Sequence, residues 1–170
     1  MSMTLTREFL GKFLNDVFVE TGTYDGRGVL LAKEVGFKTI HSIELDPLRA
    51  ARSRDAISGI DGVTVHEGDT VKILPEILST LKEKATIFLD AHPLGAGDRC
   101  KIGEYRYPLP HELKLIAEKS LRRDHTIIVD DRHEFPLYPT TEGEVVSLMK
   151  AINPNYSGWI EGDMMVGKVL

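Results

Sequence analysis

Short apolar runs alternate with helical patterns along the whole chain. The apolar runs have the length and the β-branched character of buried strands. We predict five strands from these runs: Val17–Thr21, Thr39–Leu45, Val63–Glu67, Ala85–Ala91 and Thr126–Val129. Strands that alternate with helices are typical of a mostly parallel sheet with helices on both faces. The pattern therefore predicts an α/β fold.

Helical patterns fill most of the intervals between these strands. Residues 1–15 are expected to form an N-terminal helix with one apolar stripe, made of Phe9, Leu10, Phe13 and Leu14. Further helices are predicted near Gly26–Val35, from Pro47 onward, over Val71–Lys84 with Pro75 inside it, and around Glu142–Ile152. Gly36 follows the first of these, and glycine commonly ends a helix.

The end of the chain has a different pattern. Two apolar stretches, Tyr156–Glu161 and Met164–Leu170, flank the pair Gly162-Asp163. A Gly/Asp pair between two strands is typical of a β-hairpin. We therefore predict a seven-stranded, mostly parallel sheet with a C-terminal antiparallel hairpin, in a single domain that spans residues 1–170.

Composition narrows the class of protein. The formal net charge is −5 and there is no run of lysine or arginine, which argues against a large surface for nucleic acid or anionic membrane. Cys100 is alone, so neither a disulfide framework nor a multi-cysteine zinc site is expected. The first residues lack the pattern of a secretory signal, and no apolar run approaches the roughly 20 residues of a membrane helix. We expect a cytoplasmic protein without nucleic-acid or membrane partners; a homodimer stays open.

The most informative segment is Val17–Gly28, in which a strand runs into a glycine-rich turn. Glu20, Gly22, Gly26 and Gly28 follow the pattern acidic-x-Gly-x-x-x-Gly-x-Gly. Glycine lets the backbone turn sharply and lets a ligand approach closely at the carboxyl end of the strand. The pattern resembles the first motif of class I methyltransferases that use S-adenosylmethionine (SAM). The alternative is a glycine-rich turn that binds nothing.

This resemblance covers nearly the whole chain, because class I methyltransferases also have seven strands that end in a hairpin. It implies a Rossmann-like three-layer sandwich, with SAM lying across the carboxyl ends of the first three strands. It also implies a set of cofactor-binding residues: Glu20, Thr21, Gly22, Thr23, Tyr24, Gly26, Glu44, Leu45, Asp69, Thr70 and Asp90.

Two acidic residues in this set have competing roles. Glu44 ends the second strand, where a carboxylate can accept hydrogen bonds from both ribose hydroxyls. Asp46 competes for the ribose, but its position before Pro47 also suits a helix N-cap. The resemblance implies that Asp69 binds the adenine amine, whereas capping of the following helix, a role that Thr70 could share, is the structural alternative.

Carboxylates also follow the fourth and fifth strands. Asp90 follows the fourth, and Asp130 and Asp131 follow the fifth. If these strands are neighbours, three carboxylates meet at one edge of the sheet and repel one another. A divalent cation would relieve the repulsion, and oxygen ligands suit Mg²⁺, with Mn²⁺ or Ca²⁺ as alternatives.

Here the chain resembles metal-dependent O-methyltransferases of the catechol and macrolide-sugar kinds. The resemblance implies that Asp90, Asp130 and Asp131 are metal ligands. Catechol enzymes have a lysine base shortly after the first aspartate, whereas this chain has Ala91-His92-Pro93. Neutralisation without a metal is the alternative, and three cations could supply it: Arg132, Arg99 and Lys101.

Two histidines lie close to these strand ends. We expect His92 to act as the general base, with Asp90 as its catalytic partner, and His133 to be the alternative base or metal ligand. The stretch 92–110 is rich in glycines, aromatic residues and cations, a composition suited to a lid over a substrate. A surface insertion without a role is its alternative.

The leading hypothesis is a SAM-dependent methyltransferase that acts on an oxygen of a small molecule, with assistance from Mg²⁺. No Asn-Pro-Pro-Tyr motif follows the fourth strand, which argues against methylation of base nitrogens. A non-catalytic module of the same fold that binds SAM or a nucleoside is the second hypothesis. The glycine spacing and the hairpin argue against a third, a nicotinamide-dependent oxidoreductase.

Overall fold

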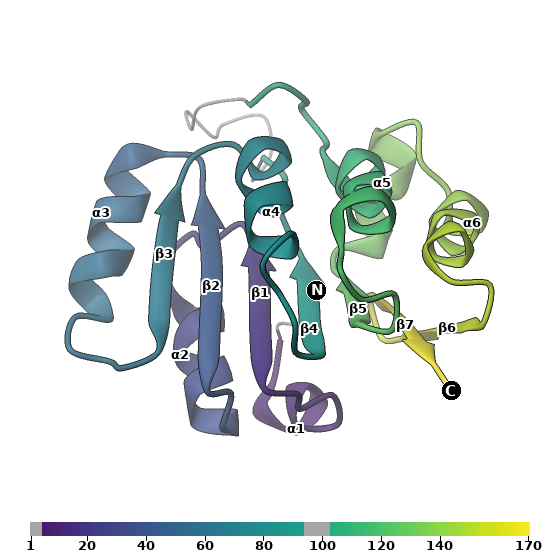
Figure 1. Ribbon diagram of the computed structural model, residues 1–170. Helices are drawn as coiled ribbons and strands as arrows, with labels where there is room; N and C mark the ends of the chain where they lie inside the picture. Colours follow the sequence, from purple (N-terminus) through teal and green to yellow (C-terminus); the bar gives the residue numbers. More distant parts are fainter. Residues whose placement is uncertain (1–4, 94–102) are drawn as a thin grey trace.

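The computed structural model describes residues 5–93 and 103–170. At its centre is a seven-stranded sheet with the order β3-β2-β1-β4-β5-β7-β6 (Figure 1). The strands are β1 (Val17–Thr21), β2 (Thr39–Glu44), β3 (Val63–Glu67), β4 (Ala85–Leu89), β5 (Thr126–Val129), β6 (Tyr156–Glu161) and β7 (Met164–Val169). All neighbours are parallel except β7, which is antiparallel to both β5 and β6. The predicted fold class is confirmed.

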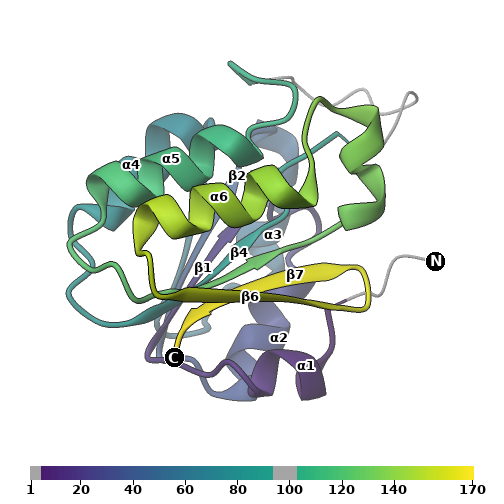
Figure 2. The same ribbon diagram turned by 90° about the vertical axis from the view of Figure 1, so that its right-hand side faces the viewer.

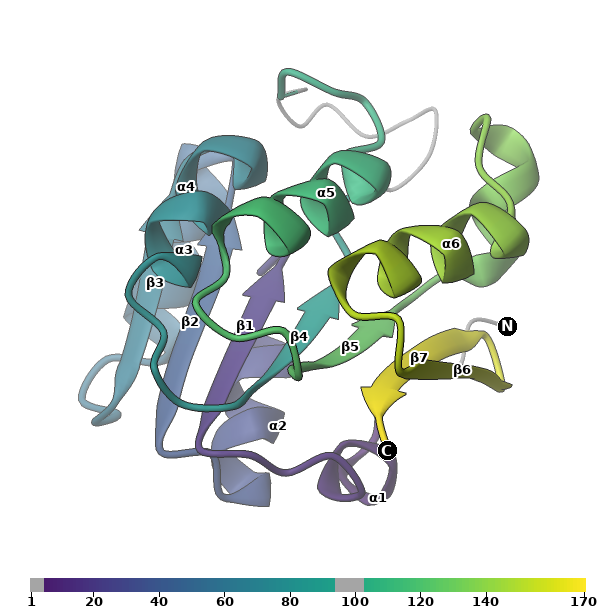
Figure 3. The same ribbon diagram turned by 45° about the vertical axis from the view of Figure 1, so that its right-hand side comes forward.

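Helices cover both faces of the sheet (Figure 2). One face carries α4 (Thr70–Leu78), α5 (Leu109–Lys119) and α6 (Glu142–Ile152), which lie side by side in Figures 2 and 3. The other face carries α1 (Arg7–Gly11), α2 (Arg27–Val35) and α3 (Pro47–Ala56). A short 3₁₀ helix, η1 (Arg132–Leu137), follows β5. The three layers match the predicted sandwich.

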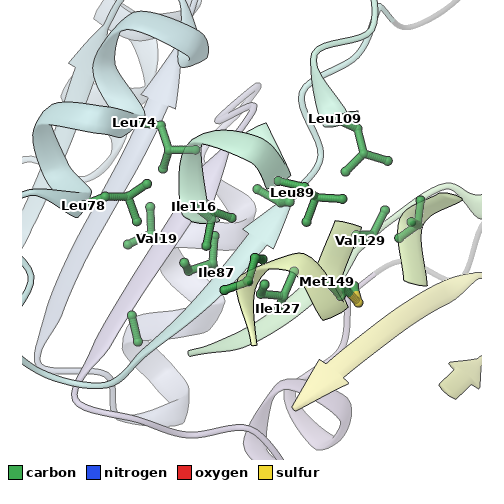
Figure 4. Close-up of a cluster of buried hydrophobic side chains, with 14 of the residues drawn as sticks. Val19, Leu74, Leu78, Ile87, Leu89, Leu109, Ile116, Ile127, Val129 and Met149 are labelled. Carbon is green, nitrogen blue, oxygen red and sulfur yellow. The ribbon is translucent and has the colours of Figure 1, made fainter. Parts of the chain in front are cut away.

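Each face of the sheet has its own hydrophobic core. On the α4–α6 face, Ile87 of the sheet packs with Ile116 of α5 and Met149 of α6 (Figure 4). On the other face, Phe18 packs with Val29 and with the buried residues of α1 and α3. Central strands are therefore buried on both sides, which explains why they read as continuous apolar runs.

The strand register aligns the ends of the central strands. Thr21 of β1 pairs with Leu89 of β4, and Leu89 pairs with Val129 of β5. The chain therefore leaves all three strands at the same edge of the sheet. This edge is where ligands bind in open α/β sheets.

Two predicted helices are shorter than expected. Residues 1–15 were predicted as one helix, but α1 spans only Arg7–Gly11 within the described residues, and Leu14 is 48% exposed instead of joining the apolar stripe. The helix predicted over Val71–Lys84 ends at Leu78. Pro75 lies inside it, as predicted, and the last residues before β4 form a turn.

The interval between β4 and β5 also differs from the prediction. Helix α5 begins at Leu109, inside the stretch 92–110 that was interpreted as a lid, and neither α5 nor η1 was predicted. Residues 94–102 of that stretch lie outside the described residues, so its role as a lid stays a prediction. Within the described ranges, no helix has the length and apolar character needed to cross a membrane.

Candidate active site

The turn between β1 and α2 brings the backbone into contact with two acidic residues. Gly22 and Gly26 have φ angles of 86° and 81°, a region that side chains disfavour. A Cβ atom on Gly22 would lie 2.5 Å from the carbonyl oxygen of Asp90, and one on Gly28 would lie 1.8 Å from Oε1 of Glu20. The glycine pattern is therefore a requirement of close packing at the strand end.

Glu20 is the buried acidic residue of this turn, with 3% of its surface exposed. Ser42 donates a hydrogen bond of 2.6 Å to Glu20, and the hydroxyls of Ser42 and Thr23 are 2.6 Å apart. Burial raises the pKa of Glu20 to about 8, although the bond from Ser42 lowers it. No lysine or arginine of the described residues forms an ion pair with Glu20. A cation in the neighbouring space would favour its ionised form.

Glu44 and Asp46 have separate roles in the structure. Asp46 accepts hydrogen bonds from the backbone N–H groups of Leu48 and Arg49, so its interpretation as the N-cap of α3 is confirmed. Glu44 is buried and accepts one backbone N–H on each carboxylate oxygen, from Tyr24 at 2.8 Å and from Asp46 at 2.9 Å. Each oxygen keeps a lone pair for a further donor. The role of Glu44 at a ribose stays a prediction.

Asp69 caps α4 and also contacts the segment before α5. Its Oδ1 atom accepts the N–H of Val71, and its Oδ2 atom accepts the N–H of Glu104. A Cβ atom on Gly103 would lie 2.5 Å from the same Oδ2 atom. The capping role is therefore confirmed, whereas the contact with the adenine amine stays a prediction. Thr70, the first residue of α4, is buried beside Asp69.

The acidic rim forms where β4 and β5 end. Asp90, His92 and Asp131 each offer one ligand atom, and these atoms all lie within 4.8 Å of one another. Asp130 was expected to be the third ligand, but His92 takes its place in this group. Asp130 Oδ1 instead accepts the N–H of Asp131 at 2.8 Å, and Asp131 has a φ angle of 50° that turns the chain here.

His92 joins the carboxylates of the rim. Its Nε2 atom is 2.7 Å from Asp131 and 3.3 Å from Asp90, and its Nδ1 atom is 3.4 Å from Glu134. Burial alone would lower the pKa of His92, but the bonds to Asp131 and Asp90 outweigh it and raise the pKa to about 11. This arrangement favours the protonated imidazole, whereas a general base has to be neutral before it accepts a proton. The role of His92 as general base stays a prediction.

The two residues that follow Asp131 pair with residues outside the group of Asp90, His92 and Asp131. His133 makes its hydrogen bond to Asp163, in the hairpin turn, and forms a second cluster with Asp163 and Asp131. Arg132 forms its ion pair with Glu142 at 2.7 Å, so it does not neutralise the rim as the alternative hypothesis proposed. Arg99 and Lys101, the other candidates for that role, lie outside the described residues.

Most of the predicted site residues line one cavity of about 450 Å³, a volume typical of small-molecule sites. One part of its wall comes from the ends of β1, β2 and β3: Glu20, Gly22, Thr23, Tyr24, Glu44, Leu45, Asp69 and Thr70. Another part is the rim: Asp90, His92, Asp130 and Asp131. Thr21 and Gly26 lie outside this lining. Thr21 is fully buried and its hydroxyl accepts the N–H of Asp90, and Gly26 precedes α2.

Two acidic residues near the site were missed in the sequence. Glu134 belongs to η1, an element that was not predicted, and Glu112 belongs to α5, which was not predicted either. Glu112 is 1% exposed. Its apolar neighbours Leu109, Leu113 and Ile116 repeat at helical spacing, which was the available signal.

The comparisons with known proteins agree with this arrangement at the level of fold. No protein-family model and no curated protein sequence matches the chain. Solved structures do match. The O-methyltransferase from Bacillus cereus in complex with SAH (S-adenosylhomocysteine) is 18% identical, with a TM-score of 0.65 over 95% of this chain and 78% of that one.

Two further solved structures match the chain with comparable identity and TM-score. The O-methyltransferase TomG from Streptomyces achromogenes, in complex with SAM, is 14% identical, with a TM-score of 0.64 over 96% of this chain and 77% of that one. The SAH-bound methyltransferase PaMTH1 from Podospora anserina is 18% identical, with a TM-score of 0.64 over 96% and 76%. The chain therefore has the Rossmann-like methyltransferase fold.

Proposed function

We propose that this protein is a SAM-dependent methyltransferase that acts on an oxygen atom of a small molecule. The observation that carries the proposal is the single cavity that runs from Glu44 and Asp69 to the rim of Asp90, His92 and Asp131. A cofactor at one end and an acceptor at the other would meet beside Gly22. The proposal is supported by solved O-methyltransferases of the same fold, which were crystallised with SAM or SAH.

The residues at the first end fit SAM. Gly22 and Gly28 line the cavity, so a ligand there meets backbone and no side chain at these two positions. Glu44 has a free lone pair on each oxygen for the two ribose hydroxyls. When bound, SAM supplies an electrophilic methyl group. The protein then has to align an acceptor oxygen behind that group and exclude water, which is mainly a matter of positioning.

The rim is proposed to bind and polarise the acceptor. Asp90, Asp131 and His92 combine two carboxylates with an imidazole, a donor set that suits Mn²⁺ as well as Mg²⁺. A bound divalent cation would lower the pKa of an acceptor hydroxyl held against it. It would also displace the proton from His92, which leaves a neutral imidazole beside the acceptor. The two carboxylates would hold the acceptor end of the cavity in a fixed geometry.

A methyl-transfer assay tests the proposal. The purified protein is incubated with SAM and a panel of catechols, hydroxylated sugars and small hydroxy acids, in Mg²⁺, in Mn²⁺ or in EDTA, and the SAH formed is measured. We expect turnover with one class of hydroxylated acceptor and its loss in EDTA. Turnover that continues in EDTA would refute the proposed metal dependence, but it would not refute SAM-dependent methyl transfer.

The same assay distinguishes a methyltransferase from the alternative, a non-catalytic binding protein. A protein that binds SAM but yields no SAH with any acceptor would be the non-catalytic module of the same fold. Asp131→Asn is the matched variant for the rim, because it keeps the size of the side chain and removes its charge. It should lose turnover while it still binds SAH.

A further inference from the structure

Two histidines face each other on neighbouring strands at one edge of the sheet. His41 belongs to β2, and His66 belongs to β3, the edge strand beside it (Figure 1). Nδ1 of His41 is 3.0 Å from Nε2 of His66, and the centroids of the two rings are 5.3 Å apart. Neither residue lines the cavity described above. The pair is therefore a group separate from the candidate active site.

Both imidazoles lie on the face of the sheet that carries α4. His41 is in register with Val19 of β1, and His66 is in register with Ile43 of β2. Val19 and Ile43 belong to the hydrophobic core on the α4 face. Residues in register on parallel strands point to the same side of a sheet, so the histidines share that face. Both are only partly buried, which places the pair at the margin of this core.

The imidazole nitrogens of the pair are not used by other groups. Among the described residues, the ion pairs that involve histidine belong to His92 and His133, and each of these contacts carboxylates. The outer nitrogens of the pair are Nε2 of His41 and Nδ1 of His66. Neither is among the buried polar atoms that lack a partner, so both are open to solvent. A small ligand can therefore reach the pair.

The charges around the pair favour neutral imidazoles. Burial is the main cause that lowers the pKa of His41 and of His66, so both are neutral at pH 7. Arg54 of α3 lowers the pKa of His66 further, whereas Glu76 of α4 raises it. Arg54 also forms an ion pair with Glu67, which offsets its charge. A metal ion binds imidazole in this neutral form.

The distance between the two facing nitrogens suits ligands of one metal ion. Two imidazole nitrogens, each about 2.0–2.1 Å from an ion and at an angle of about 90–110°, are about 2.8–3.4 Å apart. The separation of 3.0 Å between His41 and His66 falls in this range. Small rotations of both rings would aim the two lone pairs at the ion. Each imidazole would keep its proton on the outer nitrogen, which is open to solvent.

We propose that His41 and His66 form a binding site for a divalent transition-metal ion of the Cu²⁺ or Zn²⁺ kind, with water completing its coordination. Imidazole suits these ions, whereas Mg²⁺ and Mn²⁺ prefer oxygen ligands such as the carboxylates of the rim. The bound ion would cross-link the edge strand β3 to β2. The site goes beyond the proposed function and does not depend on it.

Titration of the wild-type protein with Cu²⁺, followed by electron paramagnetic resonance, tests this site. Cu²⁺ is the probe because it binds nitrogen ligands most tightly among these ions. We expect one bound ion whose spectrum shows coupling to two imidazole nitrogens. The rim and the cluster of His133 each offer only one imidazole, so this signal belongs to the pair. Zn²⁺ should displace the Cu²⁺, and Mg²⁺ should not.

Three variants assign the signal to its residues. His41→Gln and His66→Gln keep a polar side chain at each position and remove one imidazole. Each should lower the affinity for Cu²⁺ at least tenfold and abolish the coupling to two nitrogens. His133→Gln is the control, because it removes an exposed histidine elsewhere, and it should leave the two-nitrogen signal unchanged.

Two results would overturn the inference. One is a wild-type spectrum with coupling to fewer than two nitrogens, a readout that needs no variant to fold. The other is a two-nitrogen signal that persists in His41→Gln or in His66→Gln. Neither result bears on the proposed function, because no step of the experiment involves SAM or an acceptor.

Discussion

Nε2 of His92 lies 2.7 Å from Oδ2 of Asp131, so a residue that follows β4 is joined to one that follows β5. The same nitrogen is 3.3 Å from Asp90. The imidazole of His92 therefore joins the predicted ligands Asp90 and Asp131 in one group, while Asp130 lines the same cavity and its role as a metal ligand stays a prediction. Asp131 also belongs to a neighbouring cluster with His133 and Asp163. Variants of residues that belong to only one cluster therefore show which of the two binds a metal ion.

The rim should depend on Asp131, whereas the neighbouring cluster should not matter for transfer. Asp131→Asn is expected to lower methyl transfer by about a hundredfold or more and to abolish binding of Mn²⁺. The reason is that the variant leaves Asp90 as the only charged oxygen ligand of the proposed group. Asp163→Asn removes the charge that pairs with His133. Its rate of methyl transfer and its affinity for Mn²⁺ should both stay within a few fold of the wild-type values. Mn²⁺ binding is measured by electron paramagnetic resonance. Loss of Mn²⁺ binding in Asp163→Asn alone would move the metal to the other cluster.

Glu20 should make the ligand-free protein less stable as the pH rises. The pKa of this carboxyl group is about 8 in the folded protein, against 4.5 for an ordinary glutamate. Between these values the unfolded chain binds fewer protons than the folded protein, so the free energy of unfolding falls with pH. Glu20→Gln should match the wild type near pH 4.5 and be roughly 4 kcal/mol more stable at pH 8.

Urea unfolding at pH 5 and pH 8 measures both proteins. The same decrease with pH in Glu20→Gln would show that other groups cause it. His92 contributes in the same direction at higher pH: its pKa is raised from 6.5 to about 11, so the stability that it supplies is complete below pH 6.5 and is lost as the pH rises through 11.

Gly28 should tolerate no side chain without loss of cofactor binding. A Cβ atom there would lie 1.8 Å from Oε1 of Glu20, so Gly28→Ala has to displace that carboxyl group into the cavity. We expect SAM affinity to fall at least tenfold, while the gain of about 1 kcal/mol in helix propensity offsets part of the loss in stability. Gly11→Ala, with nothing within 4 Å of its Cβ, is the matched control for both measurements.

Glu44 and Asp46 should separate binding from stability. Glu44→Ala is expected to weaken SAM binding by about 1–3 kcal/mol, because charge-assisted hydrogen bonds to the ribose are lost. Asp46→Ala should instead lower the free energy of unfolding by about 1 kcal/mol, the usual value of an N-cap, and keep its affinity for SAM. Calorimetric titration and urea unfolding of both variants check the pair. Weaker SAM binding in Asp46→Ala, with unchanged affinity in Glu44→Ala, would place the ribose at Asp46.

The sheet was predictable because buried parallel strands have a strong signal in sequence. All seven strands were placed within two residues at either end, and the caps at Asp46 and Asp69 were among the predicted alternatives. Helix α5 was missed because Pro108 and Pro110 surround its start and suggest a loop. Proline at the first turn of a helix is in fact well tolerated.

Side-chain directions at the rim were less predictable. Two adjacent aspartates after β5 look equivalent in sequence, but the positive φ of Asp131 turns the backbone there, and Asp130 Oδ1 bonds to the N–H of Asp131. Glu112 was missed for a related reason, since a glutamate in a helix usually faces solvent. Tertiary packing determines both cases, and local sequence carries little of that information.

The most direct test of the account is calorimetric titration of the purified protein with SAM, SAH and NAD. The account predicts saturable binding of SAM and SAH with one molecule per chain, and no binding of NAD. Both ligands should compete for the cavity between Glu44 and the rim. Binding of NAD alone, or of none of the three, would contradict it.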